Sequence, residues 1–133
     1  MIHLIKGILT EEECKILTNQ FNIDKKTNPS FDKEEDTGAS YGFRGTHKFN
    51  TYLDKLKSKI LEINSDINEL INVNTYIREY KNNDFLDKHV DRKDISVTVS
   101  ICLDSTITKE WPLCVKINNQ EHCFNTNIGD GIV

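Results

Sequence analysis

A run of alternating side chains over residues 95–103 constrains the fold of this chain most strongly. Successive side chains of a β-strand point to opposite faces, so a period of two predicts a strand with two different faces. One face here is aliphatic and the other is small and polar, which suits a sheet that packs on helices outside and lines a wet pocket inside. The aliphatic set is Ile95, Val97, Val99, Ile101 and Leu103, and the other set is Ser96, Thr98, Ser100 and Cys102.

The first 70 residues carry helix signals. Thr10 and Glu13 match a capping box, in which each side chain accepts a hydrogen bond from the other residue's backbone amide, and a helix is expected over about 11–20. A second helix is expected over about 47–62, because its apolar residues keep the spacing of a buried face. Residues 22–47 are expected to be one long irregular segment, either a functional lid or disordered. The predicted buried face consists of Phe49, Tyr52, Leu53, Leu56, Ile60 and Ile63.

Strands are expected from residue 71 onward. Residues 73–80 alternate, and residues 112–125 match a hairpin with a two-residue turn at Asn118-Asn119. In that register Cys114 lies opposite Cys123, one hairpin face is largely apolar, and the other carries a Lys–Glu pair. The spacing of the four cysteines is not that of a disulfide framework, and the first residues do not have the features of a signal peptide. We therefore interpret the cysteines as reduced thiols, with a Cys114–Cys123 disulfide as the alternative.

The length fits a single domain over residues 1–133. The order of the expected elements, helices followed by strands, indicates the α+β class, mainly β with flanking N-terminal helices. No apolar run is long enough to cross a membrane, and the first residues lack the features of a signal peptide, so a cytoplasmic location is expected. A net charge of −4 provides no broad positive surface, which argues against non-specific nucleic-acid binding.

His89-Val90-Asp91 is the element with the clearest chemistry. An imidazole nitrogen and a carboxylate oxygen two residues apart can both reach one ion from a strand end or its following turn. The 2-His-1-carboxylate triad of non-haem Fe(II) oxygenases needs such a pair and one distant histidine, and it leaves three metal positions open. Taken alone, such a pair is more often two exposed polar residues, so the surrounding residues decide its interpretation.

The surrounding residues form an ordered series of motifs. Tyr80 stands nine positions before His89, the alternating strand follows, and then come Glu110-Trp-Pro-Leu113 and Gly129-Asp-Gly131. This series, over about residues 74–133, resembles the prolyl-4-hydroxylase-like branch of the 2-oxoglutarate/Fe(II) oxygenases. The resemblance implies a double-stranded β-helix, or jelly-roll barrel, over residues 71–133, incomplete at its last strands, with residues 1–70 as a helical layer.

The resemblance also implies roles for single residues. His89 and Asp91 match the first two iron ligands. Tyr80 matches a tyrosine that helps to bind 2-oxoglutarate, and Thr98 and Cys102 lie on the strand face that lines the cosubstrate pocket. A role in packing is the alternative for each of these three residues. Weaker candidates for substrate binding are Arg44 and Arg92, for which plain surface exposure is the alternative.

The third iron ligand of the family has no counterpart in the sequence. The family's distal histidine, and the basic residue that pairs with the 2-oxoglutarate C5 carboxylate, follow the Gly-Asp turn, whereas this sequence stops at Val133. His122 is the only histidine after Asp91, but it precedes the turn and is not expected to substitute. The resemblance therefore implies an incomplete or inactive fragment of a longer enzyme. A non-catalytic remnant and a site completed by a second chain are the alternatives.

The implied activity is oxidative decarboxylation of 2-oxoglutarate coupled to hydroxylation of a substrate. The substrate would be a prolyl or other protein side chain, or a small amino acid. The implied cofactors are Fe(II), 2-oxoglutarate and O₂, with ascorbate as a further candidate. Two other classes stay open: a metal-binding cupin-like barrel with non-oxidative chemistry, and a non-catalytic module that recognises a peptide through residues 22–47. The sequence decides neither the substrate nor the oligomeric state.

Overall fold

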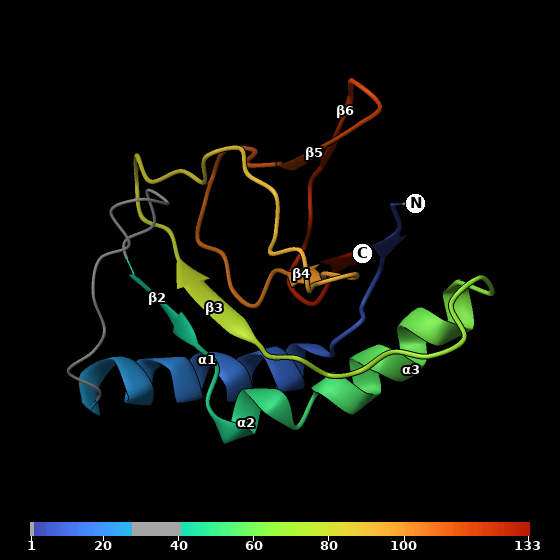
Figure 1. Cartoon of the computed structure of the whole chain (residues 1–133). Helices are drawn as coiled ribbons and strands as arrows, with labels where there is room; N and C mark the ends of the chain where they lie inside the picture. The colour runs from blue at the N-terminus through green and yellow to red at the C-terminus, as the bar shows by residue number, and fades with distance from the viewer. Residues whose placement is uncertain (1, 28–40) are drawn as a thin grey trace. The chain divides into compact units, whose positions relative to one another are not determined.

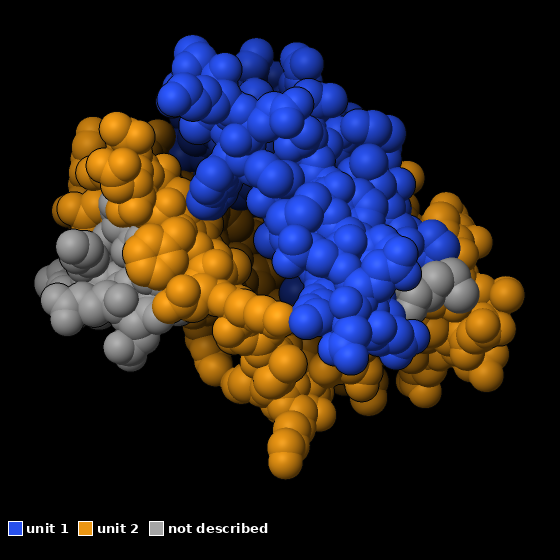
Figure 2. Space-filling model, turned by 90° about the horizontal axis from the view of Figure 1, so that it is seen from above, with its two compact units in different colours: residues 1–19, 97–133 blue, residues 20–96 orange. Residues whose placement is uncertain are grey.

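The computed structural model describes residues 2–27 and 41–133 (Figure 1). The chain forms two compact units, unit 1 with residues 1–19 and 97–133 and unit 2 with residues 20–96 (Figure 2). Along the sequence, unit 2 is therefore one continuous segment between the two parts of unit 1. In the part of the chain that is described, none of the helices has both the length and the apolar character needed to cross a membrane.

The sheet of unit 1 is built around β7 (Gly131–Ile132). This strand pairs antiparallel with β1 (Leu4–Ile5) on one side and with β4 (Ser100–Ile101) on the other. The pairing with β1 continues outward, because His3 and Val133 exchange backbone hydrogen bonds of 3.0 and 2.9 Å. The buried apolar side chains of unit 1 include Ile8, Leu9, Cys14, Leu17 and Ile132.

The strand predicted over residues 95–103 is shorter as a hydrogen-bonded element. Its ladder with β7 includes only Ser100 and Ile101, because β7 itself is two residues long. The predicted alternation is nevertheless present over residues 95–101, where aliphatic side chains are half-buried and polar ones are exposed. The two faces expected from the sequence are therefore real, although regular pairing covers only part of the segment.

The hairpin of unit 1 has the predicted register. β5 (Leu113–Ile117) pairs with β6 (Gln120–Phe124), and Cys114 lies opposite Cys123. The turn residues Asn118 and Asn119 have φ angles of 48° and 65°, the left-handed conformation that a two-residue type I′ turn requires and that asparagine tolerates. The apolar residues of β5 are half-buried and the opposite face of the hairpin is exposed, as predicted.

The prediction of reduced thiols is wrong for one cysteine pair. Cys114 and Cys123 form a disulfide, and their Cα atoms are 4.0 Å apart. This short separation fits the closely spaced, non-hydrogen-bonded type of antiparallel position, where facing side chains are nearest. The other two cysteines form no disulfide with any described residue, and Cys14 is buried while Cys102 is half-buried.

Helix α1 (Glu11–Thr27) begins with the predicted capping box. The backbone amide of Thr10 donates to Oε2 of Glu13 at 2.8 Å, and the amide of Glu13 donates to Oγ1 of Thr10 at 3.2 Å. Two of the amides that have no partner within the helix are satisfied in this way. The capping box explains why the helix starts at Glu11.

Replacing Thr10 by alanine is expected to lower the free energy of unfolding by about 1 kcal/mol, the usual loss when a helix N-cap is removed. Urea unfolding followed by circular dichroism measures the change. Thr27→Ala at the other end of α1 is the matched control, because its hydroxyl donates to the carbonyl of Ile23 in an exposed hydrogen bond. Equal losses in the two variants would contradict the role of the capping box.

α1 extends seven residues beyond its predicted end at residue 20. The polar last turns lack an apolar stripe, so the periodicity did not indicate them. Within unit 2 they are held by contacts instead: Gln20 donates to Asp24 at 2.7 Å, and the ammonium group of Lys25 lies 2.8 Å from the carboxylate of Glu79. The second contact joins residues far apart in sequence, which a local pattern cannot reveal.

Unit 2 contains a second sheet and two further helices. β2 (Tyr41–Arg44) pairs antiparallel with β3 (Tyr76–Glu79), and β2 is followed by α2 (His47–Asn50) and α3 (Leu53–Ile63). The single helix predicted over residues 47–62 is thus two helices. Ile63, expected in the core, is 40% exposed because it lies in the last turn of α3.

The core of unit 2 is aromatic. The ring of Phe43 stacks on Phe21 with centroids 5.6 Å apart and meets Phe49 edge-on at 6.5 Å. Ile60 and Ile77 are buried as well. Phe43 belongs to β2, a strand inside the segment that was expected to be irregular.

The predicted irregular segment is therefore partly regular. Its first residues belong to α1 and residues 41–44 form β2, while residues 28–40 lie outside the described residues. The described strands form three small antiparallel sheets, β1-β7-β4, β2-β3 and β5-β6. The double-stranded β-helix implied for residues 71–133 stays a prediction.

Candidate metal centre

The two residues of the HxD pair lie in the irregular segment between β3 and β4. Nε2 of His89 is 3.6 Å from Oδ1 of Asp91, and each side chain is 47% exposed. The spacing of two residues thus brings the imidazole and the carboxylate together, as the sequence predicted. Both groups are accessible to an ion from solvent.

The backbone orients the imidazole of His89. Its Nδ1 atom is 2.7 Å from the carbonyl oxygen of Asp87. A carbonyl can only accept a hydrogen bond, so this contact places a proton on Nδ1, and whenever the ring is neutral the lone pair is on Nε2. Metal-binding histidines commonly donate their other ring N–H to a carbonyl or carboxylate, which fixes the tautomer and the ring orientation. The Nε2 atom of His89 faces Asp91.

The distance between the two donor atoms is close to what a shared ion needs. Two donors that are each about 2.1 Å from an ion, at a right angle, lie about 3.0 Å apart. Nε2 of His89 and Oδ1 of Asp91 are 3.6 Å apart, so a small side-chain rotation would bring both atoms within reach of one ion. Within residues 2–27 and 41–133, no third histidine, cysteine or carboxylate joins the pair to form a three-donor cluster. The residues therefore fit two positions of an iron site.

The residues proposed for 2-oxoglutarate occupy different units. Tyr80 follows β3 and is half-buried in unit 2. In unit 1, Thr98 is exposed just before β4, and Cys102 is half-buried just after it. His122, the rejected substitute ligand, lies on β6 opposite Val115 and is exposed.

Cys102 has the chemistry of a neutral thiol. Burial, followed by the nearby charge of Asp104, raises the pKa of the Cys102 thiol above its ordinary value. Its sulfur is 3.7 Å from the carbonyl oxygen of Asp104. A thiol whose pKa is raised supplies little thiolate, so Cys102 is a weak hydrogen-bonding group rather than a nucleophile.

The two arginines proposed for substrate binding are at the surface. Arg92 forms an ion pair of 3.4 Å with Asp94, and both side chains are more than half exposed. Arg44 is the exposed last residue of β2, opposite Tyr76. Exposed ion pairs contribute little to stability, so Arg92 is available to exchange Asp94 for an anionic partner.

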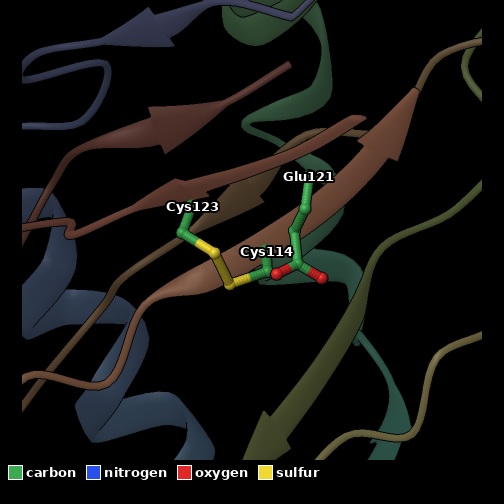
Figure 3. Close-up of side chains that lie close together, drawn as sticks. All are labelled: Cys114, Glu121 and Cys123. Atoms are coloured by element: carbon green, nitrogen blue, oxygen red, sulfur yellow. A yellow bond between two sulfur atoms is a disulfide. The ribbon is translucent and has the colours of Figure 1, made fainter. Parts of the chain in front are cut away.

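One cluster was not foreseen from the sequence. Cys114, Glu121 and Cys123 place their donor atoms within 4.8 Å of one another on the exposed face of the hairpin (Figure 3). The predicted register already contained the signal, because Glu121 is two residues from Cys123 on the same strand and therefore shares its face. The register predicted that the two cysteines face each other, but Glu121 was not predicted to join them.

Comparison with known proteins assigns the chain to no family. No protein-family model matches it, and searches of curated proteins and of solved structures gave no match. The geometry at His89, together with the resemblance of residues 74–133, is therefore the basis for a functional proposal.

Proposed function

We propose that this chain provides part of the metal centre of an Fe(II)/2-oxoglutarate-dependent dioxygenase, with His89 and Asp91 as two of the protein ligands. The observation that carries the proposal is the orientation of the His89 ring, whose Nδ1 is held by the carbonyl of Asp87 while Nε2 faces the Asp91 carboxylate. A ring held in one tautomer and one orientation loses less entropy when an ion binds.

The two side chains would divide the work at the metal. His89 offers a neutral nitrogen lone pair, and Asp91 offers a charged oxygen that offsets one of the two positive charges of the ion. A facial arrangement of protein ligands keeps the opposite positions open for a cosubstrate. Fe(II) and 2-oxoglutarate, when bound, supply the oxidative decarboxylation that drives hydroxylation of a substrate C–H bond. The substrate class proposed is a protein side chain, prolyl or other, or a small amino acid.

The three residues that the resemblance assigns to 2-oxoglutarate carry hydrogen-bonding groups. Tyr80 and Thr98 each bring a hydroxyl that can donate to a carboxylate oxygen, and Cys102 brings a thiol that its surroundings keep protonated. A protonated thiol adds no negative charge beside a dianionic cosubstrate. This absence of repulsion supports the role that the resemblance implies for Cys102.

Metal binding by the chain tests the proposal. Mn²⁺ replaces Fe²⁺ without oxidation, and the spin-resonance signal of free Mn²⁺ measures the bound fraction. We expect His89→Ala and Asp91→Ala each to weaken Mn²⁺ binding by more than about tenfold. Removing a residue that only supports a ligand already weakens metal binding by about tenfold or more, and removing a ligand should cost more. His122→Ala and Asp94→Ala are matched controls, because they remove an exposed residue of the same type from another position.

Anaerobic addition of Fe(II) and 2-oxoglutarate separates the proposed function from the two alternatives. A metal-to-ligand charge-transfer band that disappears in His89→Ala supports the dioxygenase. Metal binding at His89 and Asp91 without this band favours a metal-binding barrel with non-oxidative chemistry. Equal Mn²⁺ binding by the wild type and both variants contradicts the metal centre and favours a non-catalytic binding module.

A further inference from the structure

The exposed face of the β5-β6 hairpin gathers two sulfurs and a carboxylate. Cys114 and Cys123 face each other across the strands, and Glu121 is their neighbour on the same face. All three residues are exposed, and their donor atoms lie within 4.8 Å of one another (Figure 3). These atoms are open to solvent, to a reductant and to an ion.

The side chain of Glu121 has an ordinary alternative partner that it does not use. Lys116 is directly opposite Glu121 in the register, and a Lys–Glu pair is a favourable cross-strand contact. The ion pairs found among residues 2–27 and 41–133 nevertheless include none between these two residues. The carboxylate of Glu121 lies beside the sulfurs instead (Figure 3).

The oxidation state of the sulfurs decides what this face can bind. In the disulfide both sulfurs are neutral and already bonded to each other, so they offer a cation no thiolate. Once reduced, Cys114 and Cys123 become two thiols, and thiolate sulfur is a ligand that selects zinc-class ions. Two sulfurs bound tetrahedrally to one zinc ion lie about 3.8 Å apart. That separation fits within the 4.8 Å spanned by the three donor atoms.

We propose that the reduced hairpin binds one divalent cation of the zinc class through the sulfurs of Cys114 and Cys123 and a carboxylate oxygen of Glu121. The disulfide and the metal-bound form are then alternative states of one surface. Metal loading of the hairpin depends on the thiol–disulfide balance of its surroundings. This site has no ligand in common with the centre at His89 and Asp91, so the test of one proposal does not decide the other.

The conversion between the two states is balanced when a dithiol acts as the reductant. The dithiol gives two electrons and two protons to the sulfurs of Cys114 and Cys123 and becomes a disulfide itself. A divalent cation then forms two metal–sulfur bonds and releases both thiol protons to solvent. Glu121 supplies the third ligand, and water completes a four-coordinate shell.

Titration with Cd²⁺ tests the proposal, because thiolate-to-cadmium charge transfer gives an ultraviolet band that nitrogen and oxygen ligands do not produce. The full chain is reduced anaerobically with a phosphine, which is then removed. We expect one Cd²⁺ to bind per reduced chain with this band, and no band in the oxidised chain. The unaltered chain serves in both arms, so the comparison does not depend on whether a variant folds.

Variants then assign the ligands. Cys114→Ser with Cys123→Ser is expected to abolish the band, and Glu121→Gln to weaken Cd²⁺ binding by more than about tenfold, since a ligand should matter more than an outer-shell partner. Lys116→Gln, on the same face, is the control and should bind as the wild type does. The proposal is overturned by an unchanged band in the double serine variant, by the absence of a band in the reduced chain, or by wild-type affinity in Glu121→Gln.

Discussion

Replacing Asp130 by alanine is expected to lower the free energy of unfolding by about 3 kcal/mol, because a hydrogen bond to a charged group contributes about 1.5–3 kcal/mol. Asp130 is 4% exposed. Its carboxylate accepts hydrogen bonds from the ammonium group of Lys6 and the amide of Gly7, both at 2.9 Å, and from the amide of Asn127 at 3.1 Å. The two amides belong to the backbone, so both hydrogen bonds are lost when the carboxylate is removed.

Two control variants separate the amide contacts from the ion pair in urea unfolding. The side chain of Lys6 is 63% exposed, so Lys6→Gln should cost less than about 1 kcal/mol, as exposed ion pairs do. Asp104→Ala removes an exposed carboxylate of the same unit and should have a smaller effect still. A loss in Lys6→Gln as large as that in Asp130→Ala would show that the ion pair, rather than the amides, is what stabilises this turn.

The same contacts give a defined dependence on pH. Burial of Asp130 opposes its ionisation, but the hydrogen bonds from Lys6, Gly7 and Asn127 and the charge of Lys6 outweigh burial and hold its pKa below the ordinary value. The folded state therefore binds this proton less tightly than the unfolded state. The stabilisation is complete above the unfolded pKa, about 3.9, and is lost as the pH falls through the folded pKa. The difference in unfolding free energy between wild type and Asp130→Asn should therefore be constant near neutral pH and shrink only in acid.

Gly129→Ala should also destabilise the chain by about 3 kcal/mol, from about 1–2 kcal/mol for the left-handed conformation and a further contribution of about 1–3 kcal/mol from overpacking. Gly129 has a φ of +87°, and a Cβ atom there would collide with the backbone oxygen of Leu9. That contact cannot be relieved by a side-chain rotation. The amide of Leu9 is also hydrogen-bonded to the carbonyl of Gly129 at 3.1 Å, so moving one segment strains the other.

Gly7→Ala is the matched comparison for Gly129→Ala. Gly7 also has a positive φ, +57°, but a Cβ atom there would meet nothing within 4 Å. Its substitution should cost only the conformational part, and the difference between the two variants in urea unfolding measures the collision with Leu9. Equal losses would contradict the close approach of residue 129 to Leu9.

The parts of the fold that the sequence predicted are those specified by neighbouring residues. Thr10 and Glu13 are three positions apart, and the Asn118-Asn119 turn fixes the hairpin register by itself. β2 was missed because four residues with a central glycine give too short an alternation, and because its partner strand lies more than thirty residues further on. The state of Cys114 and Cys123 was missed for another reason, since the register predicts that two sulfurs meet but does not determine their oxidation state.

The candidate site divides in the same way. The proximity of His89 and Asp91 follows from their spacing, but the hydrogen bond from Nδ1 to Asp87 depends on the path of an irregular backbone. The register was enough to place Glu121 on the same face as the cysteines. It was not enough to predict that the carboxylate of Glu121 points away from Lys116. Lys6 and Asp130 are 124 positions apart in the sequence, so no local pattern could predict their contact.

The central place of β7 in its sheet has a consequence for the order in which the chain acquires its structure during synthesis. β1 leaves the ribosome long before β7, the strand with which it pairs. Unit 2 is the continuous segment of residues 20–96, so all of it is synthesised before β4 and β7. Until residues 131–132 emerge, Ile8 and Leu9 lack the strand that completes their unit. These two side chains can therefore reach their buried positions only after β7 has been made.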